Sequence, residues 1–337
     1  MLSWWLFNCI HILIMKRFII FLAAIAVLSV GAFAQVQTQP LPVIGDVTGE
    51  GEVDGSDINT LINILLGKDT QNYYGRDNVD GEGGVDGSDL NYLINIVLGK
   101  VNPNQPQTEV FVANGVAFTM VAVEGGTYTM GATAEQGDDG DTDEFPTHQV
   151  TLSGFTIGET EVTQALWEAV MGSNHSRYSG DPQRPVDSVT WDECQEFITK
   201  LNEVTGLTFR LPTESEWEFA ARGGNQRQGY KYAGSNNIDE VALYEDNSDN
   251  TTHAVATKAP NELGLYDMNG NVWEWCQDWY DDYPAEPQTD PMGPETGEIR
   301  AVRGGGFINS ALFCRVTIRG GLGPSSTLSY FGLRLAR

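Results

Sequence analysis

Two segments near the beginning of the chain carry oxygen-bearing side chains at matched spacing. They are DVTGEGEVDGSDINTLINILLGK, from Asp46, and NVDGEGGVDGSDLNYLINIVLGK, from Asn78. Each supplies oxygen at loop positions 1, 3, 5, 7, 9 and 12 and glycine at position 6, the arrangement of a calcium-binding loop. A pair of acidic turns without metal is the alternative, but it does not require that glycine. The predicted ligands are Asp46, Thr48, Glu50, Glu52, Asp54 and Asp57 in the first loop and Asn78, Asp80, Glu82, Gly84, Asp86 and Asp89 in the second.

An apolar stripe with helical spacing follows each loop and ends at Gly67 or Gly99, so each repeat is predicted to be one loop and one helix. The pair, residues 44–100, resembles the type I dockerin, a small all-α, EF-hand-type module that binds two calcium ions and docks on a cohesin domain. The resemblance therefore implies a cohesin-like partner. It assigns the partner contacts to loop positions 10 and 11, which are Gly55, Ser56, Gly87 and Ser88.

The first 34 residues have the pattern of an export signal. A basic pair at Lys16 and Arg17 precedes an apolar run that ends in Ala32-Phe33-Ala34, a small-residue cleavage site. Residues 1–14 are either part of the leader or an upstream extension before a start at Met15. A membrane anchor is the alternative, but the basic pair interrupts the apolar stretch. We expect a secreted, periplasmic or cell-surface protein with no membrane span after cleavage.

Charge excludes one class of partner. The chain has 46 acidic and 19 basic residues, a net charge of −27, which repels a nucleic acid backbone. Residues 101–109, rich in proline and polar side chains, are predicted to be a linker. Residues 110–337 combine short strands, few helices and many glycines, and we expect one large, irregular α+β domain there.

Two helices of the large domain are predicted from local signals. Thr213 and Glu216 form a capping box after a proline, which starts a helix there. A second helix begins near Trp191 and carries apolar side chains at spacings of three and four. Those side chains are Cys194, Phe197, Ile198 and Leu201.

A series of motifs in the large domain identifies its family. In chain order they are GGTYTMG, EFPTHQVTLSGFTIGETEVT, PVDSVTWDECQEF, FRLPTESEWEFAARGG, NELGLYDMNGNVWEWCQDW, VRGGGF and FGLRLAR. They resemble the formylglycine-generating enzyme, or sulfatase-modifying factor, domain. The resemblance implies a compact fold related to C-type lectins. It also implies a possible activity, because the family's enzymes oxidise a sulfatase cysteine to formylglycine with oxygen and copper held by two cysteines.

The segment GGGFINSALFCR, residues 304–315, decides whether that activity is expected. In the enzymes this segment carries a serine and two copper-binding cysteines, and the matching residues here are Gly306, Asn309 and Cys314. Linear copper(I) coordination requires two soft thiolates, so copper is not expected. We expect Cys314 to be a half-buried small hydrophobic residue, and Cys194 and Cys276 to lie in structural segments. Three cysteines after signal cleavage allow at most one disulfide.

Two further features of the large domain have alternative interpretations. The resemblance implies a structural calcium ion held by Asp267, Glu274 and the carbonyls of Gly270 and Val272, whereas a turn packed by tryptophans needs no ion. Six arginines near the end could line an anion-binding groove, but guanidinium groups pair well with carboxylates, and internal ion pairs are favoured. These arginines are Arg300, Arg303, Arg315, Arg319, Arg334 and Arg337.

The combined prediction is a secreted protein of two modules. The dockerin-like module binds calcium and docks on a cohesin-type partner, and the large domain acts as a binding or accessory module for a glycan or an exported protein. Such a protein could serve in polysaccharide breakdown. The alternative is a formylglycine-generating oxidase that matures exported sulfatases.

Overall fold

The computed structural model describes residues 60–62 and 107–337 of the chain. Residues 60–62 are helical, within the segment where the first repeat is expected to form its helix. The leader, both calcium loops, the predicted docking residues and most of the linker lie outside the described residues, so the dockerin-like module stays a prediction. Contacts divide the chain into two units, Met1–Pro103 and Asn104–Arg337, and the second is described here.

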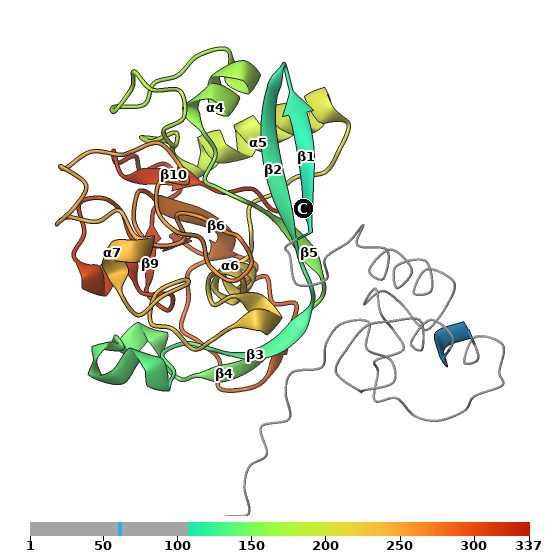
Figure 1. Ribbon diagram of the computed structural model, residues 1–337, viewed down its shortest axis with the longest axis vertical. Helices are drawn as coiled ribbons and strands as arrows, with labels where there is room; N and C mark the ends of the chain where they lie inside the picture. The colour runs from blue at the N-terminus through green and yellow to red at the C-terminus, as the bar shows by residue number, and fades with distance from the viewer. Residues whose placement is uncertain (1–59, 63–106) are drawn as a thin grey trace, which may run out of the picture. The chain divides into compact units, whose positions relative to one another are not determined.

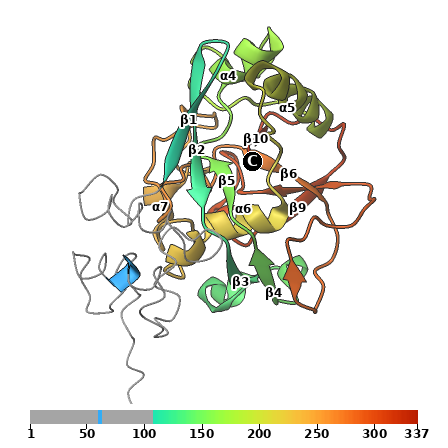
Figure 2. The same ribbon diagram turned by 90° about the vertical axis from the view of Figure 1, so that its right-hand side faces the viewer.

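Ten short strands form three small sheets in the described part of the chain (Figures 1 and 2). The antiparallel sheet β1-β2-β5 contains β1 (Thr108–Ala113), β2 (Val116–Val123) and β5 (Phe155–Gly158). The sheet β3-β4-β7 contains β3 (Gly126–Met130), β4 (His148–Leu152) and β7 (Gln288–Thr289). The sheet β10-β6-β8-β9 contains β6 (Trp273–Trp279), β8 (Arg300–Arg303), β9 (Arg319–Leu322) and β10 (Phe331–Leu333), with β10 parallel to β6.

The helices are few, and the two that local signals predict are both present. They are α4 (Gln164–Met171), α5 (Trp191–Thr205), α6 (Glu214–Ala221) and α7 (Ile238–Val241), with the 3-10 turns η1 (Ala134–Asp139), η2 (Thr142–Glu144), η3 (Gly224–Gln226) and η4 (Ala311–Cys314). The predicted capping box at the start of α6 is formed, and the four predicted apolar side chains of α5 are buried. Within the described residues, no helix has the length and apolar character needed to span a membrane.

The domain contains two main apolar cores. At one end, α4 and α5 lie beside β1 and β2 (Figures 1 and 2), and Trp167 stacks on Phe197 with ring centroids 4.9 Å apart. The other core lies between α6 and the strands β3 and β4, where Phe219 packs against Tyr128. The strands β6 and β8 contribute residues to both cores, so their sheet connects the two halves.

All eight residues of α6 are buried, although three of them are glutamates. Arginines from other elements explain this burial, because Arg303 contacts both Glu214 (3.0 Å) and Glu218 (2.7 Å). Arg319 forms a second pair with Glu214 at 2.7 Å. A buried carboxylate is tolerated when it is paired and hydrogen-bonded, so these contacts let an acidic helix serve as a core element.

The ion-pair interpretation of the C-terminal arginines is confirmed for four of the six. Besides Arg303 and Arg319, Arg315 pairs with Glu144 at 2.5 Å and Arg334 with Glu274 at 2.7 Å. All four arginines are at most 5% exposed. The two others differ. Arg300 is stacked between the rings of Trp191 and Trp279, and Arg337 lies on the surface, 3.8 Å from Glu109.

The two arginines at the end of the chain provide a matched test of this arrangement. We expect Arg334→Ala to reduce the free energy of unfolding by about 3–5 kcal/mol, because it leaves Glu274 buried without its cation. Arg337→Ala removes an exposed pair and should cost less than about 1 kcal/mol. Urea unfolding followed by tryptophan fluorescence measures both. Similar losses for the two variants would show that the buried pair does not stabilise the domain.

Candidate functional site

The segment after β8 folds back on itself and forms a compact loop. Gly304 and Gly305 adopt left-handed φ angles of 95° and 76°. A Cβ atom on Gly305 would lie 2.3 Å from the carbonyl oxygen of Phe313, so no other residue fits this close approach. The loop is anchored to the rest of the domain by Phe307, whose amide donates to the Asn271 carbonyl at 2.8 Å.

Asn309, which stands at the first cysteine position of the family's enzymes, serves to close this loop. Its Oδ1 accepts hydrogen bonds from the Gly306 amide at 3.0 Å and from Nε1 of Trp273 at 2.9 Å. The side-chain oxygen is therefore committed to two internal donors. The observed role of Asn309 is therefore structural, as a hydrogen-bond acceptor within the loop.

Cys314 is fully buried, which corrects the expectation of a half-buried side chain. It belongs to a small apolar cluster with Tyr232, Val241, Ala242 and Tyr244. Burial, with a smaller contribution from the negative charge of Glu245, raises the pKa of this thiol to about 12. The thiolate, the form that binds soft metals, is therefore strongly disfavoured at neutral pH.

The outer side of the same loop is apolar and exposed. Ile308, Leu312 and Phe313 are 37%, 49% and 44% exposed, respectively. Leu312 and Phe313 belong to the short turn η4, and the last residue of this turn, Cys314, is buried. The sequence motifs indicated only the cysteine positions of this loop, and its exposed apolar residues were not predicted. We call these three residues the apolar loop face.

The segment predicted to hold calcium is an irregular turn that leads into β6. Asp267, Gly270 and Asn271 have left-handed φ angles of 58°, 81° and 57°. A Cβ atom at Gly270 would lie only 2.0 Å from the carbonyl oxygen of Leu243, so glycine is required there. The turn brings Asp267 and Glu274 into the interior, where they are 3% and 0% exposed.

The carboxylates around this turn have different partners. Glu274 accepts from Nη2 of Arg334 at 2.7 Å and from Nε1 of Trp217 at 2.6 Å. Asp267 accepts from the Ala256 amide at 2.7 Å. Glu161 was not predicted to lie at this turn, although it belongs to one of the quoted motifs, because nothing in its local sequence indicates contacts with residues more than a hundred positions away.

Glu161 joins residues 267–274, which we call the calcium turn after the ion predicted there, through its own hydrogen bonds. It is 1% exposed and accepts from the Val272 amide at 3.0 Å and from Nδ2 of Asn271 at 2.7 Å. Burial, and then the charges of Asp267 and Glu274, raise its pKa well above the usual value. Burial also raises the pKa of Asp267 to about 6. Arg334 is the cation that faces these groups, so the turn holds more carboxylates than cations.

The carboxylates of this turn fit the chemistry of a hard cation in part, because nitrogen donors of the protein already bond to them. Asp267 and the backbone carbonyls are the kind of donor that calcium prefers, and the uncompensated negative charge favours a divalent ion. Glu274 contributes charge, but Arg334 and Trp217 already occupy its oxygens. Of the predicted donor set, the structure therefore brings Asp267 and Glu274 into one buried region together with Glu161.

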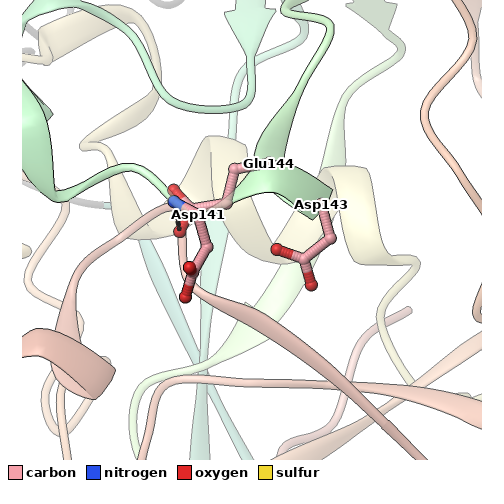
Figure 3. Close-up of side chains that lie close together, drawn as sticks. All are labelled: Asp141, Asp143 and Glu144. Atoms are coloured by element: carbon pink, nitrogen blue, oxygen red, sulfur yellow. Dashed lines mark hydrogen bonds between the residues drawn. The ribbon is translucent and has the colours of Figure 1, made fainter.

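A second acidic group lies on the turn η2, where Asp141, Asp143 and Glu144 have carboxylate oxygens within 4.8 Å of one another (Figure 3). Internal contacts account for it. Both oxygens of Glu144 accept from Arg315, at 2.5 and 2.9 Å, and Asp143 accepts from the Tyr280 hydroxyl at 2.5 Å. The side chains of Asp141 and Glu144 also form the capping box of η2. The group therefore has a structural role: it caps η2 and forms an internal ion pair with Arg315.

Comparison with known proteins agrees with the fold and these motifs. The profile of the sulfatase-modifying factor enzyme 1-like domain matches residues 107–337. The chain belongs to this family. Its mixed α/β fold resembles that of Treponema denticola variable protein 1, with a TM-score of 0.63 and 33% identity, covering 69% of this chain and 99% of that one.

Curated members of the sulfatase-modifying factor family differ in function. A chaperone protein, LppX of Paenibacillus barcinonensis, is 33% identical over 277 residues, which cover 66% of this chain and 90% of LppX. The formylglycine-generating enzyme of Thermomonospora curvata is 35% identical over 195 residues, which cover 52% of this chain and 62% of the enzyme. Membership of the family therefore establishes the scaffold, while the activity has to be argued from the site.

The cysteines of this family member lie in three separate clusters. Cys194 packs in the core with α4 and α5, Cys276 in the core with α6, and Cys314 in the small cluster behind η4. In the part of the chain that the structure describes, all three are free and fully buried. They offer no pair of thiolates that could coordinate copper(I) together.

Thiol chemistry tests this arrangement directly. In the chain that begins at Gln35, we expect none of the three cysteines to react rapidly with Ellman's reagent at pH 8, because burial raises the pKa of each thiol. All three should react once guanidinium chloride unfolds the domain. Rapid reaction of one thiol in the folded protein, abolished by Cys314→Ser, would show that Cys314 is accessible and would contradict the structure.

Proposed function

We propose that the large domain is a binding module without oxidase activity, and that it takes an exported protein as its partner. The observation that carries the proposal is the loop of residues 304–315. On its inner side, the two positions that hold copper in the family's enzymes are an asparagine with two internal donors and a buried neutral thiol. On its outer side, the loop presents apolar groups.

The chemistry of the loop favours a protein partner over an anionic glycan. Exposed clusters of aliphatic and aromatic side chains commonly mark protein interaction sites. The arginines that could have recognised sulfate or carboxylate groups, such as Arg303 and Arg315, are buried and paired. The similarity to a chaperone protein supports a role in contacting other proteins.

The remaining parts of the proposal concern the rest of the chain and its location. We propose that residues 44–100 bind two calcium ions and dock on a cohesin-like partner, and that the protein is exported after removal of residues 1–34. Docking would place the large domain in an extracellular assembly, for example one that degrades polysaccharides. A third calcium ion would be held by the turn at Asp267, with Gly270, Val272 and Glu274.

An oxidase assay decides between the proposed function and the alternative. We expect no formylglycine when the chain is incubated with a sulfatase-motif peptide, copper(I) and oxygen, because the described cysteines supply no pair of thiolates. Mass spectrometry of the peptide measures the reaction, with a formylglycine-generating enzyme as the positive control. Turnover of the peptide by this chain would restore the oxidase assignment.

A binding assay tests the apolar loop face. The double variant Leu312→Ser/Phe313→Ser should weaken binding to a permanently unfolded, carboxymethylated model protein, measured by biolayer interferometry. The matched control is Val110→Ser/Val112→Ser, because these side chains on β1 are exposed by 64% and 60% and lie on another element. If both double variants bind like the unmodified chain, the loop is not the contact surface.

Calcium stoichiometry tests the two kinds of metal site separately. We expect isothermal titration to detect two ions in the repeats and one in the large domain. Asp57→Ala/Asp89→Ala should remove the pair, and Asp267→Asn the single ion. Six of the eight tryptophans lie in the large domain and two in the leader. Calcium at about 100 times its Kd should therefore add roughly 2.7 kcal/mol to the stability that tryptophan fluorescence reports. An unchanged melting curve would exclude the large-domain ion.

A further inference from the structure

A cavity of about 290 Å³ lies at the beginning of α6, between the ends of β3, β4 and β6 and the chain that follows β6. Its walls include Met130, Pro284, Met292 and Pro294, and its polar lining includes Asp278. None of its lining residues belongs to the loop 304–315 or to the calcium turn. The cavity is therefore a separate feature from the sites described above.

Asp278 is a buried carboxylate without a cationic partner. It is 5% exposed, and its Oδ2 accepts from the Glu214 amide at 2.9 Å. None of the ion pairs among the described residues includes Asp278. The neighbouring Glu214, by contrast, is paired with both Arg303 and Arg319.

Further acidic residues lie around Asp278, and their negative charge makes its ionised form less favourable. Asp281 and Asp282 also line the cavity. Burial, and after it the charges of Glu214 and Glu216 on α6, raise the pKa of Asp278 to about 7. On the side of β8, the charge of Arg300 interacts with Asp278, but its guanidinium is stacked between two tryptophans and forms no salt bridge with this carboxylate. A cation that entered the cavity would offset the free-energy cost of burying the ionised carboxylate.

The cavity is poorly suited to an anion, although Arg319 and His148 line it. Arg319 donates to both oxygens of Glu214 and to the carbonyls of Asp143 and Asp281, so its guanidinium is already surrounded by acceptors. The ring of His148 packs against Tyr283, with centroids 5.1 Å apart. Arg319 therefore has no free pair of N–H donors for a phosphate or carboxylate.

The aromatic residues of the cavity are also engaged by cations of the protein. The guanidinium carbon of Arg319 lies 3.8 Å from the ring centroid of Tyr283, and that of Arg300 lies 3.5 Å from the ring centroid of Trp279. A quaternary ammonium ion depends on open aromatic faces. A ligand that can donate hydrogen bonds to Asp278 has the advantage here.

We propose that this cavity binds a primary ammonium group carried on an apolar chain, with the ammonium against Asp278 and the methylene groups against Met130, Pro284, Met292 and Pro294. A free alkyl diamine and the lysine side chain of a peptide share this chemistry. The proposal is independent of the function of the loop after β8, because the two features have no residue in common.

Calorimetric titration of the chain that begins at Gln35 tests the proposal, in saturating calcium so that the acidic loops are occupied. The probes are 1,5-diaminopentane and Nα-acetyl-lysine amide, which distinguish a free diamine from a peptide side chain. Pentan-1-ol and the trimethylated lysine derivative are the comparison ligands. We expect heat with at least one primary amine, weaker binding of the trimethylated compound and no heat with the alcohol.

Substitutions locate the site. Asp278→Asn should weaken amine binding by about tenfold or more, since a hydrogen bond to a charged group contributes roughly 1.5–3 kcal/mol. The asparagine oxygen can still accept from the Glu214 amide, and a melting curve checks the fold. The control Asp249→Asn removes an exposed carboxylate outside the cavity and should leave the affinity unchanged.

A second substitution keeps the test decisive if Asp278→Asn destabilises the domain. Met292 is 63% exposed at the cavity, so Met292→Arg should fold and should repel the ammonium group, whereas Met292→Leu should bind normally. The proposal is overturned if neither amine binds, if the alcohol binds as well as the amines, or if the Asp278 and Met292→Arg variants retain full affinity.

Discussion

Burying a carboxylate without a partner costs several kcal/mol, and this domain buries Glu144, Glu214, Glu218 and Glu274 almost completely. The fold therefore depends on arginines that arrive from distant segments to pair with them. The short strands contribute little hydrogen-bonded structure of their own, so these pairs fix how the irregular segments meet. The acidic helix α6 shows the dependence most directly, because it could not be a core element without the guanidinium groups that surround it.

The loop after β8 is also held by a few internal contacts. Its backbone is held by glycines and by the Asn309 oxygen, which bonds to Gly306 and Trp273. The described contacts account for the shape of the loop. Cys314 contributes packing, since its thiol sits among apolar groups. The apolar loop face is left exposed by this arrangement.

Local signals predicted the local structure well. The capping box of α6 and the apolar spacing of α5 identified both helices, and the ordered motifs identified the family. Long-range partners could not be predicted, because sequence spacing carries no information on pairs such as Glu144 and Arg315, which are 171 residues apart. Glu161 was missed at the calcium turn for the same reason. The extent of burial of Cys314 was underestimated because it depends on aromatic residues about 70 to 80 positions earlier.

Three buried carboxylates of the domain, Glu161, Asp267 and Asp278, form no salt bridge with an arginine in the part of the chain that the structure describes. Glu161 and Asp267 share the guanidinium of Arg334, and Asp278 forms no salt bridge among the described residues, although the charge of Arg300 interacts with it. In each place burial raises the carboxyl pKa, so a nearby cation would favour the ionised form. The two places differ in what they can accept. The calcium turn is lined by oxygen donors and suits a compact divalent ion, whereas the cavity at Asp278 has apolar walls and space for methylene groups. The two proposed sites therefore differ in the cation that their linings would favour.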